Sequence, residues 1–289
     1  MHSRRVLTLA LAMSPGVGGK TITRTLIRND ALSRTVPEFL ALSAETLVEE
    51  YGFKSNAASA WVLASPALLK KAEAEHSRLD AFGVRLATPA DAHYPPRVEA
   101  LDPDPPGLLY LYGNLSLIGL ETACVVASRG APFDALEMVE QVAEEHVLAG
   151  RILVSGHDTK PYQRASVVPL RWGAPRIVVL DSGLFAALGP ELKDEPFAAA
   201  RLWRFQFDPR TDLAVSAVAP GTDYHRNSNK IRDRLVVALS ARLDLAWVSE
   251  GGNMDRLARL ALKAGRKVRV NPIAPAAPIL LSLGADEIR

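Results

Sequence analysis

The sequence predicts an α/β protein in which a mainly parallel sheet with helices on both faces follows a small helical domain. Three observations predict this fold. Helical patterns fill the chain up to about residue 85, strand-like and helical segments alternate after residue 107, and a proline-rich stretch separates the two patterns. At 289 residues, the chain is long enough for two domains, each with its own core.

The first part of the chain, residues 1–85, has the pattern of short helices joined by turns. The apolar segment "RRVLTLALAM" is followed by the turn "SPGVGG", and Ser43 is placed to cap the helix "AETLVEEY". The segment from residue 56 to 83 supplies one or two further helices. After a short strand at "VRLATP", the stretch "DAHYPPRVEALDPDPPG" is rich in proline, so we expect an extended linker over residues 86–106.

Strands alternate with helices in residues 107–289. Helices are expected at 134–149, 161–172, 229–242 and 253–265, and strands at "LLYLYGN", "TACVVA", "RILVS", "PRIVVLDS", "DLAVSAVA", "DLAWVS" and "KVRVN". Right-handed crossovers between parallel strands bring several strand ends to one edge of the sheet. We therefore predict a Rossmann-like domain over residues 107–289.

The composition indicates a globular protein without a dominant charge. Hydrophobic residues make up 48% of the chain, charged residues 23%, and the formal net charge is +2, so an anion site must come from local clustering. The one cysteine, Cys124, lies in an apolar strand, which leaves no disulfide framework and no CxxC metal pattern. We expect a cytoplasmic protein that needs no metal and no cofactor, and no segment is long enough to span a bilayer.

A first candidate site is the turn "SPGVGGKT" in the helical domain. Gly16 and Gly18 would let the backbone approach a DNA phosphate, and Lys20 would add a charge, as in a helix-hairpin-helix. A tight turn in a small helical domain explains the same glycines equally well. The spacing excludes a Walker A loop.

A second candidate site combines two strand ends. Ser128 and Arg129 follow one strand, and Ser155 and Gly156 follow the next. An arginine fork and a serine hydroxyl both suit phosphate oxygens, and a glycine permits close approach of the backbone. From spacing alone, a surface turn with an incidental arginine is the slightly better interpretation.

A third candidate site is the basic start of the helix after "PGTDYHRNSN". Lys230, Arg232 and Arg234 are close in sequence, and helix N-terminal amides together with cations favour a polyanion. A solvated, charged helix start is the alternative. Ser155, His157 and Asp158 do not form a triad pattern, because G-x-S-x-G is absent and adjacent loop residues seldom orient one another. We expect no enzyme and, in particular, no centre for DNA cleavage.

These segments together resemble the DNA-processing protein A family, DprA or Smf, from about residue 7 to 272. "YPPRVEALDPDPPGLLYLYGN" resembles the family's entry to its Rossmann-like domain. "ASR" stands at its Gly-Ser-Arg, "VSG" opens its Ser-Gly loop, "APGTDYH" resembles its Pro-Pro-Gly-Thr loop, and "RDRLVVALS" resembles its Arg-Asn-Arg helix start. The order and spacing of these pieces are more specific than any one of them. The resemblance adds Lys160, Gly221 and Thr222 to the candidate DNA-binding residues.

The resemblance implies a cytoplasmic homodimer, formed through the Rossmann-like domain, that binds single-stranded DNA. It also implies protection of incoming DNA and help in loading the RecA recombinase during transformation or recombination. The chain departs from the family at Ala127, at Thr159–Pro161 and at Asp233, whose charge should oppose DNA binding, so that Asp233→Asn should strengthen it. The chain ends soon after the last strand, and we expect the winged helix of many relatives to be absent.

Two other functions of the same superfamily remain as alternatives. The first is a Rossmann-like sensor that binds a nucleotide-derived small molecule in the same strand-end pocket. The second is a nucleoside-monophosphate hydrolase, whose Pro-Gly-Gly-x-Gly-Thr-x-x-Glu signature is not found; "EGGNMDRLA" shares only the double glycine. Titration with single-stranded DNA, duplex DNA and free nucleotides distinguishes these functions.

Overall fold

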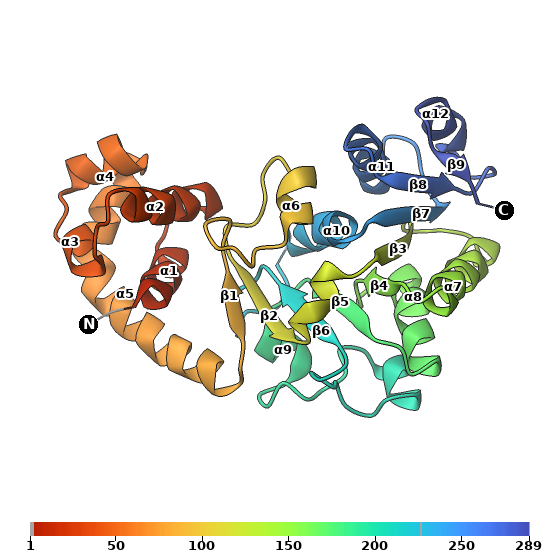
Figure 1. The fold of residues 1–289 in the computed structure, drawn as a ribbon, viewed down its shortest axis with the longest axis horizontal. Coiled ribbons are helices and arrows are strands. Elements are labelled where there is room, and N and C mark those ends of the chain that lie inside the picture. The colour runs from red at the N-terminus through yellow and green to blue at the C-terminus, as the bar shows by residue number, and fades with distance from the viewer. Residues whose placement is uncertain (1–2, 226, 289) are drawn as a thin grey trace. The chain divides into compact units, whose positions relative to one another are not determined.

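Helices make up the first part of the chain, and a mainly parallel sheet organises the rest (Figure 1). The computed structural model describes residues 3–225 and 227–288. Two units result: residues up to Tyr94 with Asp104–Leu109, and Pro95–Pro103 with the residues from Tyr110 onward. This division differs from the predicted boundaries at residues 85 and 107, because the segment between them contributes to both units.

The first unit contains five helices and one short strand among its described residues. Ser3 and Ser43 cap α1 and α4 by accepting hydrogen bonds from the amides of Val6 and Thr46. The predicted cap at Ser43 is therefore confirmed. The segment after residue 54, for which one or two helices were expected, is one helix of 27 residues. The elements are α1 (Arg4–Met13), α2 (Gly19–Ala31), α3 (Val36–Leu40), α4 (Ala44–Tyr51), α5 (Ser55–Ala81) and β1 (Arg85–Ala87).

Two glycines tie residues 104–109 to the helices of the first unit. A Cβ atom on Gly107 would lie 2.1 Å from the Cα of Gly19, so only glycine fits at this contact. The Tyr94 hydroxyl donates to the carbonyl of Pro106 (2.7 Å), and Lys20 Nζ lies 3.1 Å from an Asp104 carboxylate oxygen. The return of the chain to the first unit is thus fixed by backbone contact and side-chain bonds.

The predicted linker is partly helical rather than extended. Helix α6 (Pro96–Leu101) begins inside it, with Pro95 as N-cap and Pro96 as the first helical residue. Proline is tolerated at this position because the first amides of a helix have no partner within the helix. The prediction of an extended linker is therefore wrong at this point, because Pro95 and Pro96 begin a helix.

The sheet of the second unit has the strand order β2-β6-β5-β4-β3-β7-β8-β9. Strand β2 runs antiparallel to β6, and every other pairing within this order is parallel. This architecture confirms the predicted mainly parallel α/β sheet. The strands are β2 (Leu109–Gly113), β3 (Thr122–Ala127), β4 (Ile152–Ser155), β5 (Arg176–Leu180), β6 (Leu213–Ser216), β7 (Arg242–Trp247), β8 (Lys267–Val270) and β9 (Asp286–Glu287).

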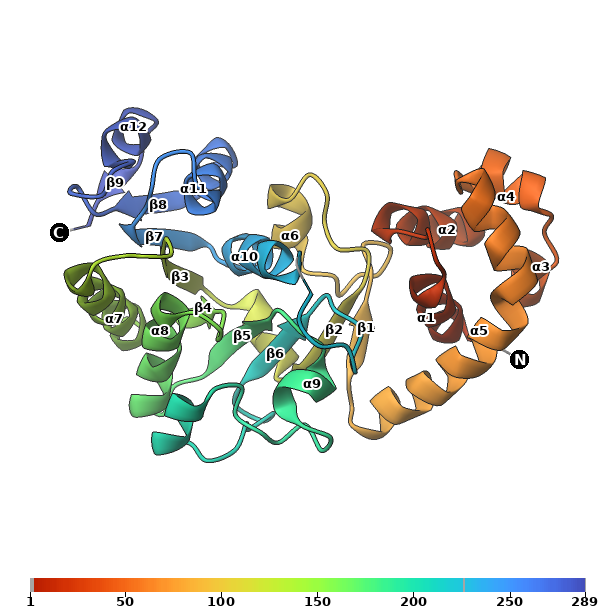
Figure 2. The same ribbon diagram turned by 180° about the vertical axis from the view of Figure 1, so that it is seen from behind.

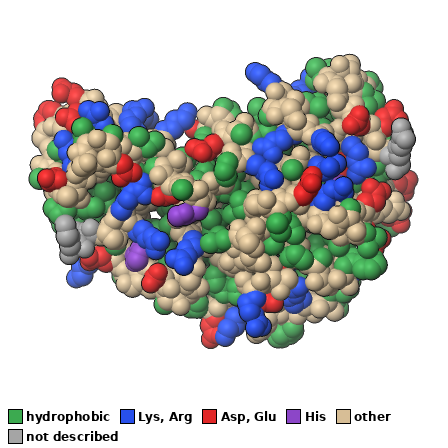
Figure 3. Space-filling model, viewed as in Figure 1, with side chains coloured by type: hydrophobic (Ala, Val, Ile, Leu, Met, Phe, Trp, Pro, Cys, Tyr) green, Lys and Arg blue, Asp and Glu red, His purple; other side chains and the backbone are tan. Residues whose placement is uncertain are grey.

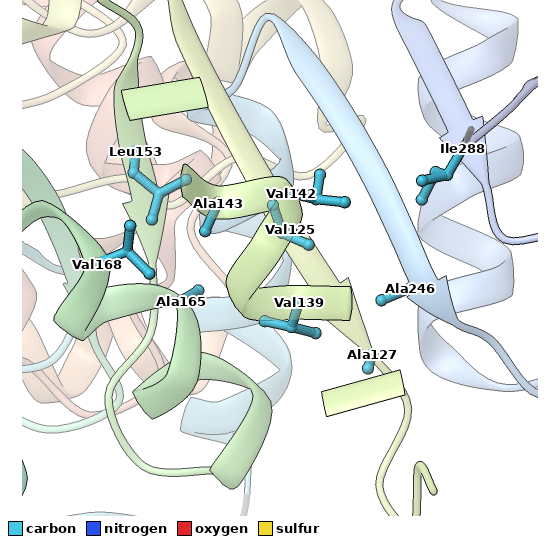
Figure 4. Close-up of a cluster of buried hydrophobic side chains, with 10 residues drawn as sticks. All are labelled: Val125, Ala127, Val139, Val142, Ala143, Leu153, Ala165, Val168, Ala246 and Ile288. Atoms are coloured by element: carbon cyan, nitrogen blue, oxygen red, sulfur yellow. The ribbon is translucent and has the colours of Figure 1, made fainter. Parts of the chain in front are cut away.

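Helices lie on both faces of this sheet (Figures 1 and 2). Helices α7 and α8 pack on one face, and α10 and α11 pack on the other. Small aliphatic side chains fill the space between the sheet and α7 and α8, among them Val125 and Leu153 from the strands and Val139 and Val168 from the helices (Figure 4). The helices are α7 (Phe133–Leu148), α8 (Lys160–Arg171), α9 (Leu184–Leu188), α10 (Ser228–Leu239), α11 (Asn253–Lys263) and α12 (Ala277–Ser282), with short turns η1 (Leu115–Gly119) and η2 (Ala198–Leu202).

A buried arginine fixes the long connection between β5 and β6, called the excursion below. The sequence patterns predicted no element in it. Arg176 is fully buried, and its guanidinium donates to carboxylate oxygens of Asp212 (2.9 Å) and Glu195 (2.5 Å). Arg204 also donates to Asp212 (2.7 Å). Because a buried charge needs partners, this network fixes residues 189–212 against α8 and the sheet. No helix among residues 3–225 and 227–288 is long and apolar enough to cross a membrane.

We expect Arg176→Met to lower the free energy of unfolding by about 3–5 kcal/mol, because Glu195 would stay buried without its cation and Asp212 would keep only Arg204. Urea unfolding followed by circular dichroism measures the change. Arg201→Met is the control, because Arg201 is exposed on the same excursion. A loss below about 1 kcal/mol for Arg176→Met would contradict a structural role for this network.

Candidate functional site

The candidate site is a pocket at the carboxyl ends of the central strands of the second unit. Its volume is about 530 Å³. The loops after β3, β4, β5 and β7 contribute to its wall, and so do the loop before α10 and the first turns of α10 and α11. The chain adds strands on one side of β3 up to β6 and then on the other side from β7 onward. Ligands of open α/β sheets bind at such a reversal of strand order.

The loop after β3 presents a cation beside a fixed serine. Ser128 connects the ends of two strands: its amide donates to the carbonyl of Trp247 (2.8 Å), and its Oγ accepts from the amide of Ser249 (3.0 Å). The next residue, Arg129, is exposed, and no ion pair holds it among the described residues. Its guanidinium is therefore available to an anion at the pocket.

Arg232, in the first turns of α10, is the most constrained cation of the pocket. Only 2% of it is exposed, and its guanidinium faces both carboxylate oxygens of Asp158, with Nη2 at 3.1 Å from Oδ2. Its Nε donates to Asp233 (2.8 Å), and its guanidinium stacks 4.5 Å from the centre of the Tyr162 ring. Arg232 is thus already held by two carboxylates and a ring.

Asp233 is a hub of hydrogen bonds rather than a free negative charge. It accepts from the hydroxyl of Tyr162 (2.9 Å), from Arg232 and from Nδ2 of Asn253 (2.8 Å). Burial raises the pKa of Asp233, while Arg232, Tyr162 and Asn253 lower it in part. Burial and the Asp233 carboxylate raise the pKa of Tyr162 well above its usual range, so the phenol keeps its proton and remains a donor.

The formal charge of the pocket is balanced. Three cations line it, Arg129, Lys230 and Arg232, and so do three carboxylates, Asp158, Asp181 and Asp233. Lys230 is exposed at the start of α10, and no ion pair holds it among the described residues. Asp181 lies 3.4 Å from Nε2 of His157. The two exposed cations, and not Arg232, therefore carry the charge that an incoming anion meets.

Four of the predicted site residues meet at this pocket: Ser128, Arg129, Lys230 and Arg232. Arg234 does not line it, since its Nε lies 3.1 Å from Asp102, next to α6. Arg232 and Arg234 are two residues apart, which is about 200° around α10, so their side chains point in different directions. The predicted cluster of three cations is therefore reduced to Lys230 and Arg232.

The other predicted residues lie behind or beside the pocket. Ser155 is buried at the end of β4, and Gly156 packs against Arg232 and Tyr162, where a Cβ would lie 2.7 Å from the Arg232 Nη1. Lys160 lines a neighbouring groove. Gly221 and Thr222 lie in the exposed loop after β6, outside the pocket wall.

In the first unit, Gly16, Gly18 and Lys20 have local structural explanations. Gly16 has a φ of +79°, which favours glycine in the turn between α1 and α2. Gly18 is the N-cap of α2, and Lys20 pairs with Asp104. The secondary DNA contact assigned to these residues stays a prediction.

Several polar residues of the pocket were not predicted from the sequence to face a ligand, among them Asp158, Asp181 and Asn253. The strand-end rule that identified Ser128 also applies to Asp181, which directly follows β5, and to Asn253, which begins the helix after β7. The bidentate contact of Asp158 with Arg232 joins residues 74 positions apart and has no sequence signal. In the part of the chain that the structure describes, no three His, Cys, Asp or Glu side chains are grouped to hold a metal ion.

Comparison with solved structures places this fold among known ones. DNA processing protein A (DprA) from Streptococcus pneumoniae superposes with a TM-score of 0.73 at 19% identity, over 100% of this chain and 95% of that one. DNA processing protein A from Helicobacter pylori, a structure described for its single-stranded DNA binding mode, superposes with a TM-score of 0.54 at 18% identity, over 72% of this chain and 91% of that one.

The comparison with curated protein sequences gives no match. The family model for DNA recombination-mediator protein A matches residues 85–279, which is more than half of the chain. This range includes every residue that lines the pocket. The order of the sequence motifs and the fold agree with that match, and the chain belongs to the DNA recombination-mediator protein A family.

Proposed function

We propose that the second unit binds the phosphate backbone of single-stranded DNA at the strand-end pocket. The observation that carries this proposal is the position of Arg129 and Lys230, two exposed cations that line one pocket, from the loop after β3 and from the start of α10, at the reversal of strand order. Cations at strand ends bind phosphates without reading bases. Membership of the family, and the DNA binding described for the Helicobacter pylori protein, support the same ligand.

We further propose a binding role rather than catalysis. The Ser155 hydroxyl, the nucleophile of the triad considered in the sequence, is buried and does not line the pocket. A nucleophile must reach the reacting atom before any base can activate it. Protection of incoming DNA, RecA loading, a role in transformation and a homodimer through the Rossmann-like unit are proposals that rest on family membership.

A second candidate ligand is a nucleotide-derived small molecule. The balanced charges favour it, because carboxylates such as Asp158 and Asp181 accept hydrogen bonds from the hydroxyl and amino groups of a nucleoside. Tyr224 is 55% exposed on the pocket wall and offers a ring to a base. Competition separates the two ligands: a mononucleotide that displaces single-stranded DNA only at concentrations far above the oligonucleotide favours DNA as the ligand.

The double variant Arg129→Ala, Lys230→Ala should bind single-stranded DNA of any sequence more weakly. The slope of log affinity against log salt concentration should shrink by about 0.7 for each phosphate contact that is lost. Fluorescence anisotropy across a salt series measures both quantities. A control with the same loss of charge is Lys193→Ala with Arg210→Ala, two exposed residues outside the pocket. An unchanged salt slope in the pocket variant would place the DNA elsewhere.

Asp158→Asn should strengthen binding of single-stranded DNA by about fivefold, equivalent to roughly 1 kcal/mol. Asp158 takes both terminal nitrogens of Arg232, which a phosphate would otherwise use, and its side chain is 25% exposed. Asp158 is a better position for this change than Asp233, because the buried Asp233 carboxylate accepts from Tyr162, Arg232 and Asn253, and an amide there would leave one of these donors without an acceptor.

The control for Asp158→Asn is Asp223→Asn, which removes one exposed carboxylate from the loop before α10 without touching the pocket wall. It should change affinity by much less. Equal effects of the two variants would show that net charge, and not release of Arg232, controls binding.

A further inference from the structure

A second concave surface adjoins the pocket on the outside of α7 and α8. This groove has a volume of about 460 Å³, and its central side chains are Phe133, Leu136, Val167 and Trp203. Its edges carry Lys160, Arg164 and Arg171, and no Asp or Glu side chain lines it among the described residues. Figure 3 shows hydrophobic side chains over much of the part of the second unit that contains α7 and α8, with charged side chains of both signs around them. The groove thus has the excess of positive charge that the pocket lacks.

The two aromatic side chains of the groove are exposed and are paired with arginines. Phe133 is 61% exposed, and the guanidinium of Arg164 lies 6.0 Å from its ring centre. Trp203 is 42% exposed, and the guanidinium of Arg171 lies 5.1 Å from its ring centre. Large exposed rings are costly in water, so their grouping in one groove indicates a binding surface.

Glu140 keeps these arginines in place without removing the positive charge. Its carboxylate accepts from Arg164 (2.8 Å) and also pairs with Arg171. Burial acts to raise the pKa of Glu140, but hydrogen bonds and charge from the two arginines lower it, so it stays ionised. One carboxylate thus orients two arginines and neutralises one of their two charges. With Lys160 added, the groove keeps a positive net charge.

Residues of the groove follow residues of the pocket directly in the chain. Phe133, the first residue of α7, follows Arg129 by four positions, and Lys160, the first residue of α8, directly follows pocket residue Thr159. Lys160, Arg164 and Arg171 stand at i, i+4 and i+11, which is one stripe along α8 about 16 Å long. A chain that leaves the pocket therefore meets a row of cations with rings beside it.

We propose that the groove is a second subsite for single-stranded DNA, in which Phe133 and Trp203 stack bases while Lys160, Arg164 and Arg171 face phosphates. The inference rests on the proposed function, because it takes the strand from the pocket onward. Aromatic rings together with cations are the combination that binds single strands without sequence preference. An acidic partner protein or a second copy of this chain would use the same surface differently and is distinguished by the test.

The test compares a short oligonucleotide of about 4 nucleotides, which fills the pocket alone, with one of about 15 that reaches the groove. The double variant Phe133→Ala, Trp203→Ala should bind the long oligonucleotide at least about fivefold more weakly for each ring removed, and the short one unchanged. Phe133→Tyr with Trp203→Phe should restore the affinity, because the rings remain. Phe205→Ala, an exposed ring of the same excursion outside the groove, is the matched control.

A long oligonucleotide with abasic sites in its second half separates stacking from charge. It should bind the wild type and the alanine double variant equally, because neither complex can stack bases there. Loss of the long-oligonucleotide affinity with the abasic strand as well would overturn the assignment of stacking to these rings.

The outcomes also separate this inference from the proposed function. If Arg129→Ala with Lys230→Ala weakens the short oligonucleotide but the ring variant leaves the long one unchanged, the groove subsite is wrong and the pocket assignment stands. If the ring variant weakens the long oligonucleotide while the pocket variant affects neither, the pocket assignment is wrong. A change of oligomeric state in the ring variant, measured by sedimentation, would assign the groove to a second copy of the chain and overturn the DNA subsite.

Discussion

Arg232 is buried where the loop after β4 meets the first turns of α10 and α11, and its guanidinium is tolerated there because two carboxylates contact it. Asp158 comes from the loop after β4, Asp233 from α10 itself, and Asn253 joins the network from α11 through Asp233. Leaving a charge of this kind without a partner is among the costliest changes in a protein interior. The positions of the β4 loop, α10 and α11 are therefore coupled, and with them the shape of the pocket.

This network divides the cations of the site into two groups with different tasks. Arg232 shapes the pocket, because its hydrogen-bonding directions are already used by protein carboxylates. Arg129 and Lys230 are solvent-exposed and line the pocket, so they are the cations proposed to bind phosphate. A sequence motif with two arginines in three residues, Arg232-Asp233-Arg234, thus yields no exposed phosphate ligand, since Arg234 pairs with Asp102. Basic residues that are close in sequence therefore do not always form a positively charged surface, because carboxylates can neutralise them in the fold.

The sequence allowed the strands and most helices of the second unit to be predicted, because alternating apolar runs and periodic helices reflect local burial. The segment with Pro95 and Pro96 was misinterpreted as extended, since the same prolines are compatible with a helix start. The excursion held by Arg176 had no periodic pattern, because long-range ion pairs rather than an apolar stripe fix it. The strand-end rule predicted Ser128 and Arg129, and the basic start of α10 predicted Lys230 and Arg232. The pairing of Asp158 with Arg232 depends on the tertiary fold alone.

The contact between Gly19 and Gly107 has a consequence for how this architecture is divided. The chain leaves the first unit after Tyr94, contributes α6 to the second, and returns to the first at Asp104 before leaving again. Neither unit is a continuous stretch of sequence, so no single cut in the chain separates them. A fragment that starts at residue 110 would lack Asp102 and leave Arg234 without its carboxylate, and one that ends at residue 94 would lack the glycine that covers Gly19. At the level of the gene, the coding segments of the two units alternate. Moving either unit into another protein would therefore require joining the chain at more than one place.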